Sequence, residues 1–254
     1  MSIQFSDSSG PSGIIQRIEL ELGFEYGYIS RNPTRLKEWT SEINLTHDET
    51  LAMIFACGGT WQFDDSNHGD APTITANLVS GQRDYAFTTD EDGHIVLDIY
   101  RVMIKTPQGL YVDLTPADQQ EPNTNLGFVD GQNLTGTPIK YDKTANAILL
   151  DLIPNYNSTG GIKVFINREG SYFLTTDSTK KPGIDGRLHE IYVVGPCAKY
   201  AGRKSLSNYN DLARRKIALV GDVVTDTKGM LQKIYGSRQR DVKGVISPRV
   251  ENTR

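Results

Sequence analysis

The sequence has few of the residues from which disulfide frameworks and metal centres are built. Its 254 residues include two cysteines, Cys57 and Cys197, which are too few for a disulfide framework or a structural zinc site. We therefore expect a reducing, cytoplasmic setting and two buried, inert thiols. The histidines are His47, His68, His94 and His189. Their positions show no metal-ligand spacing, so we expect no resident metal and no cofactor.

Long apolar runs and a basic surplus are also missing. No stretch approaches the roughly 18 apolar residues that a membrane-spanning helix needs. Residues 1–13 have neither the basic start nor the apolar core of a signal peptide. The formal net charge is −4, and a nucleic-acid-binding protein usually carries a positive surplus. We expect no membrane association and no sequence-specific nucleic-acid binding.

Catalytic signatures are absent from the sequence as well. It contains no G-x-S-x-G elbow, no G-x-x-x-x-G-K-[ST] phosphate loop, no H-E-x-x-H and no G-x-G-x-x-G after a strand. His189-Glu190 lacks a second histidine four residues after the first, and we expect His189 to pack near the start of its helix. These patterns indicate that the protein is not an enzyme.

Two short segments of the sequence are rich in acidic residues. Asp64–Asp70 holds several oxygen ligands of the kind that Ca²⁺ prefers, but Thr75 stands where an EF-hand places its glutamate. Because Asp, Asn and Gly also build turns, the turn is the favoured interpretation, and calcium binding stays open. Asp90–Gly93 is predicted to be a hairpin turn with solvated carboxylates.

Helical periodicity marks both ends of the chain. Residues 14–22 carry one apolar stripe, and Asn32-Pro33 begins a second helix that ends at Gly58-Gly59. Periodicity returns from Gly186 to Ala201, across Pro196, and again from Asn208 or Asn210 to Ile234. Beyond Gly236 we expect an extended tail, which is either a frayed terminus or an arm that orders on a partner.

Between these helices the sequence is typical of β-structure. Residues 73–79 and 83–88 are predicted to form a hairpin around Ser80-Gly81-Gln82, and 95–106 continues through a turn to 110–114. Residues 138–142 pair with 147–153, and Ile162, Val164 and Ile166 alternate toward a buried face. The predicted fold class is α+β: a helical bundle of two N-terminal and two C-terminal helices, with an inserted antiparallel β-sandwich or barrel.

Charge is divided unevenly along the chain. Residues 38–130 hold 16 acidic and 3 basic side chains, whereas residues 180–254 hold 16 basic and 7 acidic ones. In one interpretation the two regions neutralise each other within one fold. In the other, the subunit has an acidic side and a basic side, which suits head-to-tail association with copies of itself.

The order of features resembles a known family. The features are Arg35–Trp39 in the N-terminal helix, Gly81–Phe87 with Tyr85-x-Phe87, Ile99–Val102, Leu114–Asp118, Gly136-Thr137-Pro138 with Tyr141, Ile148–Leu150 leading to Pro154, Ile162-x-Val164-x-Ile166, His189-Glu190 with Val193, and Ala198-x-Tyr200-Ala201. In this order, over residues 13–235, they resemble the head-to-tail connector adaptors of tailed bacteriophages, of the tail tubular protein A type. The Gly/Val-rich stretch at residues 220–224 departs from the strong helix former expected there.

The resemblance implies a virion structural protein. Such adaptors form a ring, usually of twelve copies, beneath the portal protein in the neck of the virion, and they join it to a tail or neck protein while DNA passes through the lumen. They are assembled in the cytoplasm of the bacterial host. Under this resemblance, residues 1–59 and 180–235 form the helical ring-forming domain, 60–179 form the inserted β-domain, and 236–254 form a C-terminal arm.

Charged residues are the candidates for the contacts of such a ring. The basic residues expected to dock on the portal are Arg238, Arg240, Lys243, Arg249 and Arg254. The residues expected at the interface between ring subunits are Arg214, Arg215, Lys216, Asp64 and Asp65. The alternatives are another neck, tail or head-decoration protein, and a carbohydrate-binding module that uses Trp61, Tyr85, Tyr100 and Tyr111.

Overall fold

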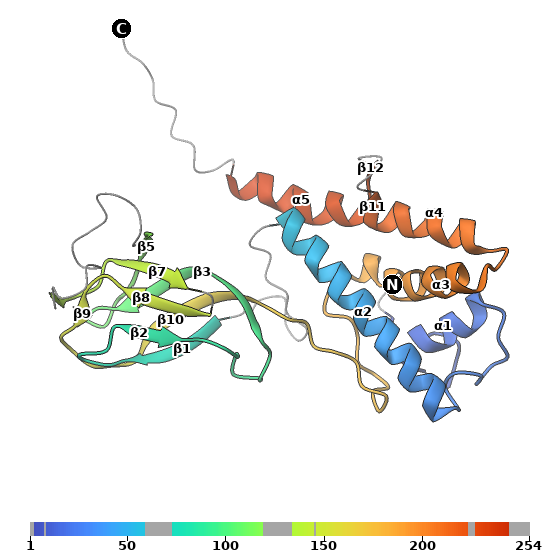
Figure 1. Ribbon diagram of the computed structural model, residues 1–254, viewed down its shortest axis with the longest axis horizontal. Helices are drawn as coiled ribbons and strands as arrows, with labels where there is room; N and C mark the ends of the chain where they lie inside the picture. The colour runs from blue at the N-terminus through green and yellow to red at the C-terminus, as the bar shows by residue number, and fades with distance from the viewer. Residues whose placement is uncertain are drawn as a thin grey trace, which may run out of the picture. The chain divides into compact units, whose positions relative to one another are not determined.

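The chain forms two compact units (Figure 1). The computed structural model describes residues 3–7, 9–58, 73–118, 134–144, 146–222 and 227–243, of which 144, 222, 227 and 237–243 are described by their backbone only. The helical unit is Met1–Trp61 with Gly170–Arg254, and the β unit is Gln62–Glu169. The β unit is therefore inserted between two segments that together build the helical unit. The predicted α+β class is confirmed.

The helical unit draws its helices from both ends of the chain. They are α1 (Ile14–Glu21), α2 (Pro33–Gly58), the 3₁₀ turn Gly186–Leu188, α3 (Ile191–Lys204), α4 (Tyr209–Val220) and α5 (Met230–Lys243). Asn32 caps α2 as predicted, because its Oδ1 accepts the N–H groups of Thr34 and Arg35, both at 3.1 Å. Helix α3 runs through Pro196, also as predicted, and packs against α1, α2 and α4.

The last predicted helix is in fact two helices. Helix α4 ends at Val220, and Gly221 has a φ of +93°, which only glycine adopts readily. A short antiparallel pair, β11 (Gly221–Asp222) and β12 (Thr227–Lys228), precedes α5. The described residues thus hold five α-helices: the two predicted N-terminal helices are confirmed, but the C-terminal part has three where two were predicted. The tail expected to be extended from residue 236 is helical through Lys243.

The β unit contains two four-stranded sheets. Its strands are β1 (Thr73–Leu78), β2 (Asp84–Ala86), β3 (Val96–Lys105), β4 (Tyr111–Asp113), β5 (Thr115–Pro116), β6 (Thr135–Gly136), β7 (Lys140–Thr144), β8 (Ala147–Leu150), β9 (Ile153–Pro154) and β10 (Ser158–Arg168). The sheet orders are β1-β10-β3-β4 and β2-β8-β7-β5, and β6 pairs with β9. All pairs are antiparallel except β5–β7 and β6–β9.

One hydrophobic core serves both sheets. Ile162, Val164 and Ile166 are fully buried on one face of β10, as their alternation predicted. They share this core with Tyr141, Ile148 and other residues of the second sheet. Both sheets are open, so the barrel alternative was wrong.

The three pairing predictions for the β unit have different outcomes. The β3–β4 and β7–β8 hairpins form as predicted. The turn at Ser80-Gly81-Gln82 also forms, with a φ of +84° at Gly81, but its flanking strands do not pair with each other. Strand β1 pairs with β10, and β2 pairs with β8, so this turn carries the chain from one sheet to the other.

The return from the β unit occurs earlier than predicted. Residues 170–179 were expected in the β-domain, but they belong to the helical unit. Phe173 is buried there, with its ring stacked on Phe5 at a centroid distance of 5.0 Å and edge-on to Tyr192 at 6.2 Å. The aromatic contact explains the boundary, because Phe173 fills the core of the helical unit.

Candidate functional site: a groove between helices α2 and α3

The basic residues predicted on α4 are largely engaged within their own unit. The Arg215 guanidinium pairs with Glu21 and, at 2.6 Å, with Glu190. These carboxylates raise the pKa of Arg215 and hold it in place. Lys216 Nζ lies 3.8 Å from Glu49 Oε2, whereas Arg214 is exposed. The predicted ring-interface residues of α4 are therefore not one free basic surface.

Further ion pairs join the basic C-terminal region to the acidic helix α2. Lys199 Nζ lies 2.6 Å from Glu49 Oε1, and Arg203 Nη2 lies 2.6 Å from Glu42 Oε1. For these residues the first interpretation of the charge pattern holds, because the two regions neutralise each other within one fold. Exposed pairs of this kind contribute at most about 1 kcal/mol each.

The net charge of the helical unit and that of the β unit have opposite signs. By sequence, the helical unit has 20 Lys and Arg residues against 16 Asp and Glu residues, a balance of +4. The β unit has 7 against 15, a balance of −8. The helical unit of one copy and the β unit of another copy therefore carry opposite net charges.

The other predicted contact residues are only partly within the described part of the chain. Arg238, Arg240 and Lys243 fall on the backbone of α5, where no side chain is described. Asp64 and Asp65, with the whole Asp64–Asp70 segment, lie outside the described residues, as do Arg249 and Arg254.

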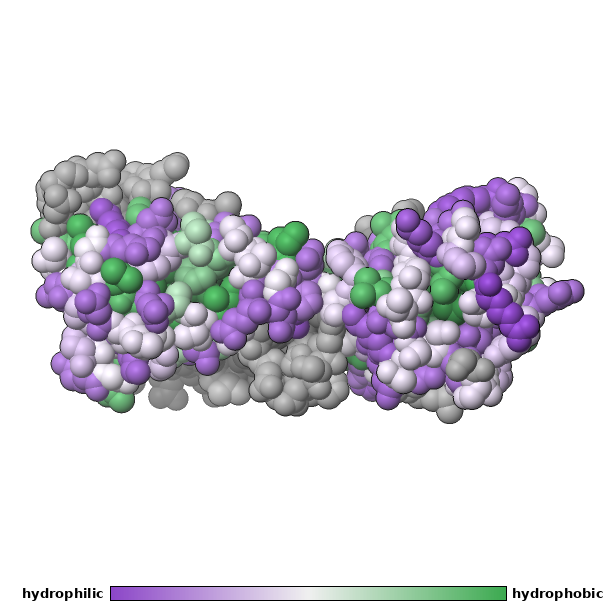
Figure 2. Space-filling model, turned by 90° about the horizontal axis from the view of Figure 1, so that it is seen from below, coloured by the Kyte–Doolittle hydropathy of each residue, from purple (hydrophilic) through white to green (hydrophobic). Residues whose placement is uncertain are grey.

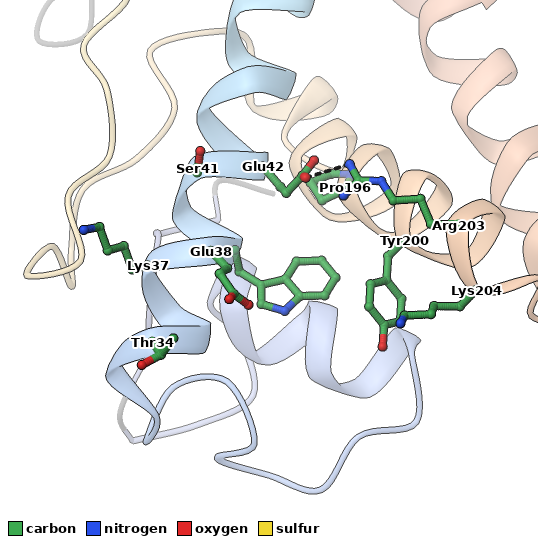
Figure 3. A pocket seen from close by; sticks show the side chains of 10 residues that line it. Thr34, Lys37, Glu38, Ser41, Glu42, Pro196, Tyr200, Arg203 and Lys204 are labelled. Carbon is green, nitrogen blue, oxygen red and sulfur yellow. Dashed lines mark hydrogen bonds and ion pairs between the residues drawn. The ribbon is translucent and has the colours of Figure 1, made fainter.

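A groove of about 780 Å³ runs between α2 and α3 (Figure 3). Its apolar surface comes from Trp39, Pro196 and Tyr200, and the rings of Trp39 and Tyr200 are 5.3 Å apart between centroids. Trp39 was predicted to be a core residue, and it is only 7% exposed. It therefore packs into the unit and also lines the floor of the groove.

Charged side chains surround this apolar floor. Figure 3 shows Glu42 turned toward Arg203 across the groove, the pair that already neutralises both groups. Glu38 and Lys204 are exposed beside the floor and have no ion pair with a described residue, whereas Lys37 points away from Trp39 and Tyr200 (Figure 3). The rim thus offers one unpaired ammonium group, that of Lys204, and one unpaired carboxylate, that of Glu38.

Aromatic side chains continue beyond the groove toward the α1–α2 connection. Phe24 lies 5.8 Å from Tyr200 and 4.5 Å from Tyr28 between ring centroids. The Arg35 guanidinium lies 3.7 Å from the centre of the Tyr28 ring, a cation–π contact. Clustered Tyr, Trp and Arg side chains are typical of the centres of protein–protein interfaces. The sequence signal for this surface is the aromatic and basic content of residues 24–39, which helical periodicity alone does not single out.

Asp90, Asp92 and His94 are the one group with metal-ligand potential in the described part of the chain. Arg168 Nη1 lies 3.1 Å from Asp90 Oδ2 and also contacts the His94 ring. Asp90 Oδ1 accepts the N–H groups of Asp92 and His94 at 3.0 and 2.8 Å. A guanidinium inside the cluster opposes a cation, and the backbone bonds are those of a closed turn. The predicted turn at Asp90–Gly93 is confirmed, but the expectation of solvated carboxylates was wrong for Asp90, whose side chain is only 9% exposed.

The histidines and cysteines of the helical unit are structural. His189 Nδ1 accepts the N–H of Ile3 at 3.0 Å at the start of α3, where it was predicted to pack. His47 is buried, and its Nδ1 lies 2.7 Å from Tyr192 Oη. Cys197 is buried as expected, whereas Cys57 is only partly buried; desolvation raises the pKa of both thiols, which disfavours the reactive thiolate.

His47 makes the stability of the helical unit depend on pH. Burial, with a smaller effect of Lys180, lowers its pKa from 6.5 to about 4. Between these values the unfolded chain binds a proton that the folded chain does not, so stability falls as the pH falls. From pH 7 to pH 5 we expect a loss of about 2 kcal/mol, measured by urea unfolding at each pH.

His47→Gln provides the control for this dependence. The variant is expected to lose most of the slope between pH 7 and pH 5, and only the smaller effect of His189, whose pKa burial also lowers, should remain. An unchanged slope in the variant would assign the pH dependence to other groups.

The four aromatic residues of the carbohydrate alternative do not form one exposed face. Tyr85 is buried, and its Oη accepts the N–H of Val79 at 3.0 Å. The Tyr100 hydroxyl is also buried, and burial raises the pKa of that residue to about 12. Tyr111 is exposed on β4, and Trp61 lies outside the described residues.

Among the described residues, no helix is both long and apolar enough to cross a bilayer. The groove between α2 and α3 is then the described feature with the character of a binding surface, since it combines an apolar floor with unpaired charges. No family model matches the chain, and no curated protein matches its sequence.

Proposed function

We propose that this chain is a virion structural protein, a head-to-tail connector adaptor of a tailed bacteriophage. In the proposal, twelve copies form a ring beneath the portal protein, DNA passes through the lumen, and a tail or neck protein binds the opposite side. The helices form the bundle that builds the ring wall, and the β unit receives tail-side partners.

The observation that carries the proposal is the way the chain is divided. The two ends of the chain fold together as the helical unit, and the segment between them folds as a separate β unit. This division supports the resemblance in the order of sequence features over residues 13–235. It also suits a protein that contacts several partners at once, because each unit offers its own surface.

Electron microscopy of the protein mixed with portal complexes tests the proposal. We expect an added ring coaxial with the portal. Portal particles that gain no density would overturn the adaptor function, and so would tight binding of duplex DNA by the free protein at physiological salt. A glycan-array signal instead would favour the carbohydrate-binding alternative.

Removing residues 237–254 is expected to abolish portal binding and to leave the subunit folded. The buried residues of α5 in the described part, Leu231 and Tyr235, precede the cut. Tyr235 Oη accepts the N–H of Asp185 at 3.1 Å, so the packing of α5 on the unit is retained. Co-sedimentation with portal complexes measures binding, and circular dichroism checks the fold. A truncated chain that still decorates the portal would show that docking uses another surface.

A further inference from the structure

The sheet β1-β10-β3-β4 has an outer face, opposite to the core, that carries basic side chains. The buried residues of β3 and β10 alternate with residues on this outer face. The strand register places three of the seven basic residues of the β unit there: Arg101, Lys105 and Lys163. The carboxylates of the β3–β4 hairpin are those of Asp98 and Asp113. The balance between these groups decides the charge of the face.

Two ammonium groups on the outer face remain without a carboxylate partner. Arg101 binds Asp113 through bonds of 2.6 and 2.9 Å, so these two charges cancel. Asp98 is paired with Lys143 of β7. The two lysines of the outer face have no ion pair with a described residue. The face therefore has a surplus of two positive charges, although the β unit as a whole has a balance of −8.

The aromatic rings on the outer face lie beneath these cations. The Arg101 guanidinium lies 4.7 Å and the Lys163 ammonium 5.7 Å from the centre of the Phe165 ring. Lys105 Nζ lies 6.0 Å from the centre of the Tyr111 ring, whose hydroxyl donates to a backbone carbonyl of β10 at 2.6 Å. Cation–π contacts hold an ammonium group over a ring and leave its N–H groups free to bind an anion. The cations are thus ordered before a partner binds, which lowers the entropic cost of binding.

The position of the cations favours a protein partner over nucleic acid. Single-stranded nucleic acid binds by stacking its bases on exposed aromatic rings. Here cations lie over the Phe165 and Tyr111 rings, so these rings are not free for a base. The negative β unit also repels a polyanion, whereas a segment with few carboxylates meets the local positive surplus. On the visible face of the β unit, apolar residues lie scattered among hydrophilic ones (Figure 2), so polar contacts suit this unit.

The two free lysines are diagonal neighbours on the sheet. Lys163 of β10 is opposite Met103 of β3, and Lys105 follows two residues later on the same face. Diagonal neighbours of this kind are about 7–8 Å apart. Residues two positions apart in an extended chain are separated by nearly the same distance, about 6.6–6.8 Å. The outer face therefore matches an extended segment with acidic residues at alternate positions.

We infer that the outer face of the sheet β1-β10-β3-β4 binds an extended acidic segment of a protein partner. Two carboxylates at alternate positions pair with Lys105 and Lys163, and the residue between them faces away from the sheet. The identity of the partner rests on the proposed function, in which the β unit receives a tail or neck protein.

A short, fluorescently labelled peptide of alternating threonine and glutamate tests this site, with binding to the full chain measured by anisotropy. We expect the peptide to bind, and the variant with Lys105→Glu and Lys163→Glu to bind it about tenfold or more weakly. A peptide of the same composition has its glutamates in adjacent pairs. Because it can reach only one lysine at a time, we expect it to bind the original chain about threefold or more weakly than the alternating peptide.

The matched control carries Lys140→Glu and Lys143→Glu on β7 of the second sheet, which change the charge of the β unit by the same amount. It is expected to bind the alternating peptide like the original chain, and circular dichroism checks that both variants are folded. Absence of binding to the original chain, an equal loss in the control, or equal affinity for the two peptides would overturn the site. Tighter binding of oligothymidylate, lost in the first variant, would also overturn it and assign the face to nucleic acid.

The peptide experiment separates this inference from the proposed function. If the peptides do not bind as expected but portal complexes gain a ring, the adaptor function stands and the acidic-segment site is wrong. If the peptides bind as expected but portal complexes gain no density, the site stands and the adaptor function is wrong.

Discussion

Replacing Glu19 by alanine is expected to destabilise the helical unit by about 4 kcal/mol. The Glu19 carboxylate is 1% exposed and accepts three backbone N–H groups from the α1–α2 connection. The donors are Gly27 at 3.0 Å, Ile29 at 2.7 Å and Ser30 at 2.9 Å. Alanine leaves all three without an acceptor, and each buried unsatisfied donor costs about 1–3 kcal/mol.

Urea unfolding followed by far-UV circular dichroism measures this loss. Glu25→Ala is the matched control, because Glu25 lies in the same connection but is exposed, and it is expected to change stability by no more than about 0.5 kcal/mol. Equal stability of the two variants would show that water replaces the carboxylate at no cost. Since the connection leads to Tyr28 and Arg35, the Glu19 variant should also loosen the aromatic surface beside the groove.

Local sequence patterns predicted much of this fold, because they reflect interactions between residues that are close in sequence. The cap at Asn32 and the alternation of Ile162, Val164 and Ile166 each involve groups within a few residues, and both were confirmed. The pairing of β1 and β2 was not predictable in this way. Tight turns look alike whether their strands pair with each other or with distant ones, and the partners here lie at residues 147–150 and 158–168.

The candidate site was predicted less well than the fold. A count of charges along the chain does not show which of them pair, so Arg215 was assigned to an interface although two carboxylates of its own unit hold it. The groove brings residues 34–42 together with residues 196–204, which are far apart in sequence. Trp39 fits the apolar stripe of its helix, so the sequence predicted only its place in the core. Its place in the floor of the groove depends on α3, which packs beside α2.

Replacing Gly229 by alanine is expected to destabilise the α4–α5 junction by about 3 kcal/mol or more. A Cβ at this position would lie 2.2 Å from the Gly221 nitrogen and 2.4 Å from the Val220 carbonyl carbon. Both are backbone atoms, so no side chain can move aside to relieve the overlap, and the β11–β12 pair must shift. Because α4 and α5 meet through this pair, the helical unit should unfold at lower urea concentration.

Gly236→Ala is the control within the same region. A Cβ there meets nothing within 4 Å, and the residue lies inside α5. Alanine loses less backbone entropy than glycine in a helix, so this variant should be more stable by about 0.5–1 kcal/mol. The same substitution, seven residues apart, thus has opposite expected signs. If both variants unfold at the original urea concentration, the close approach of Gly229 to Gly221 does not support the junction, and other contacts of α5, such as those of Leu231 and Tyr235, hold it to the unit.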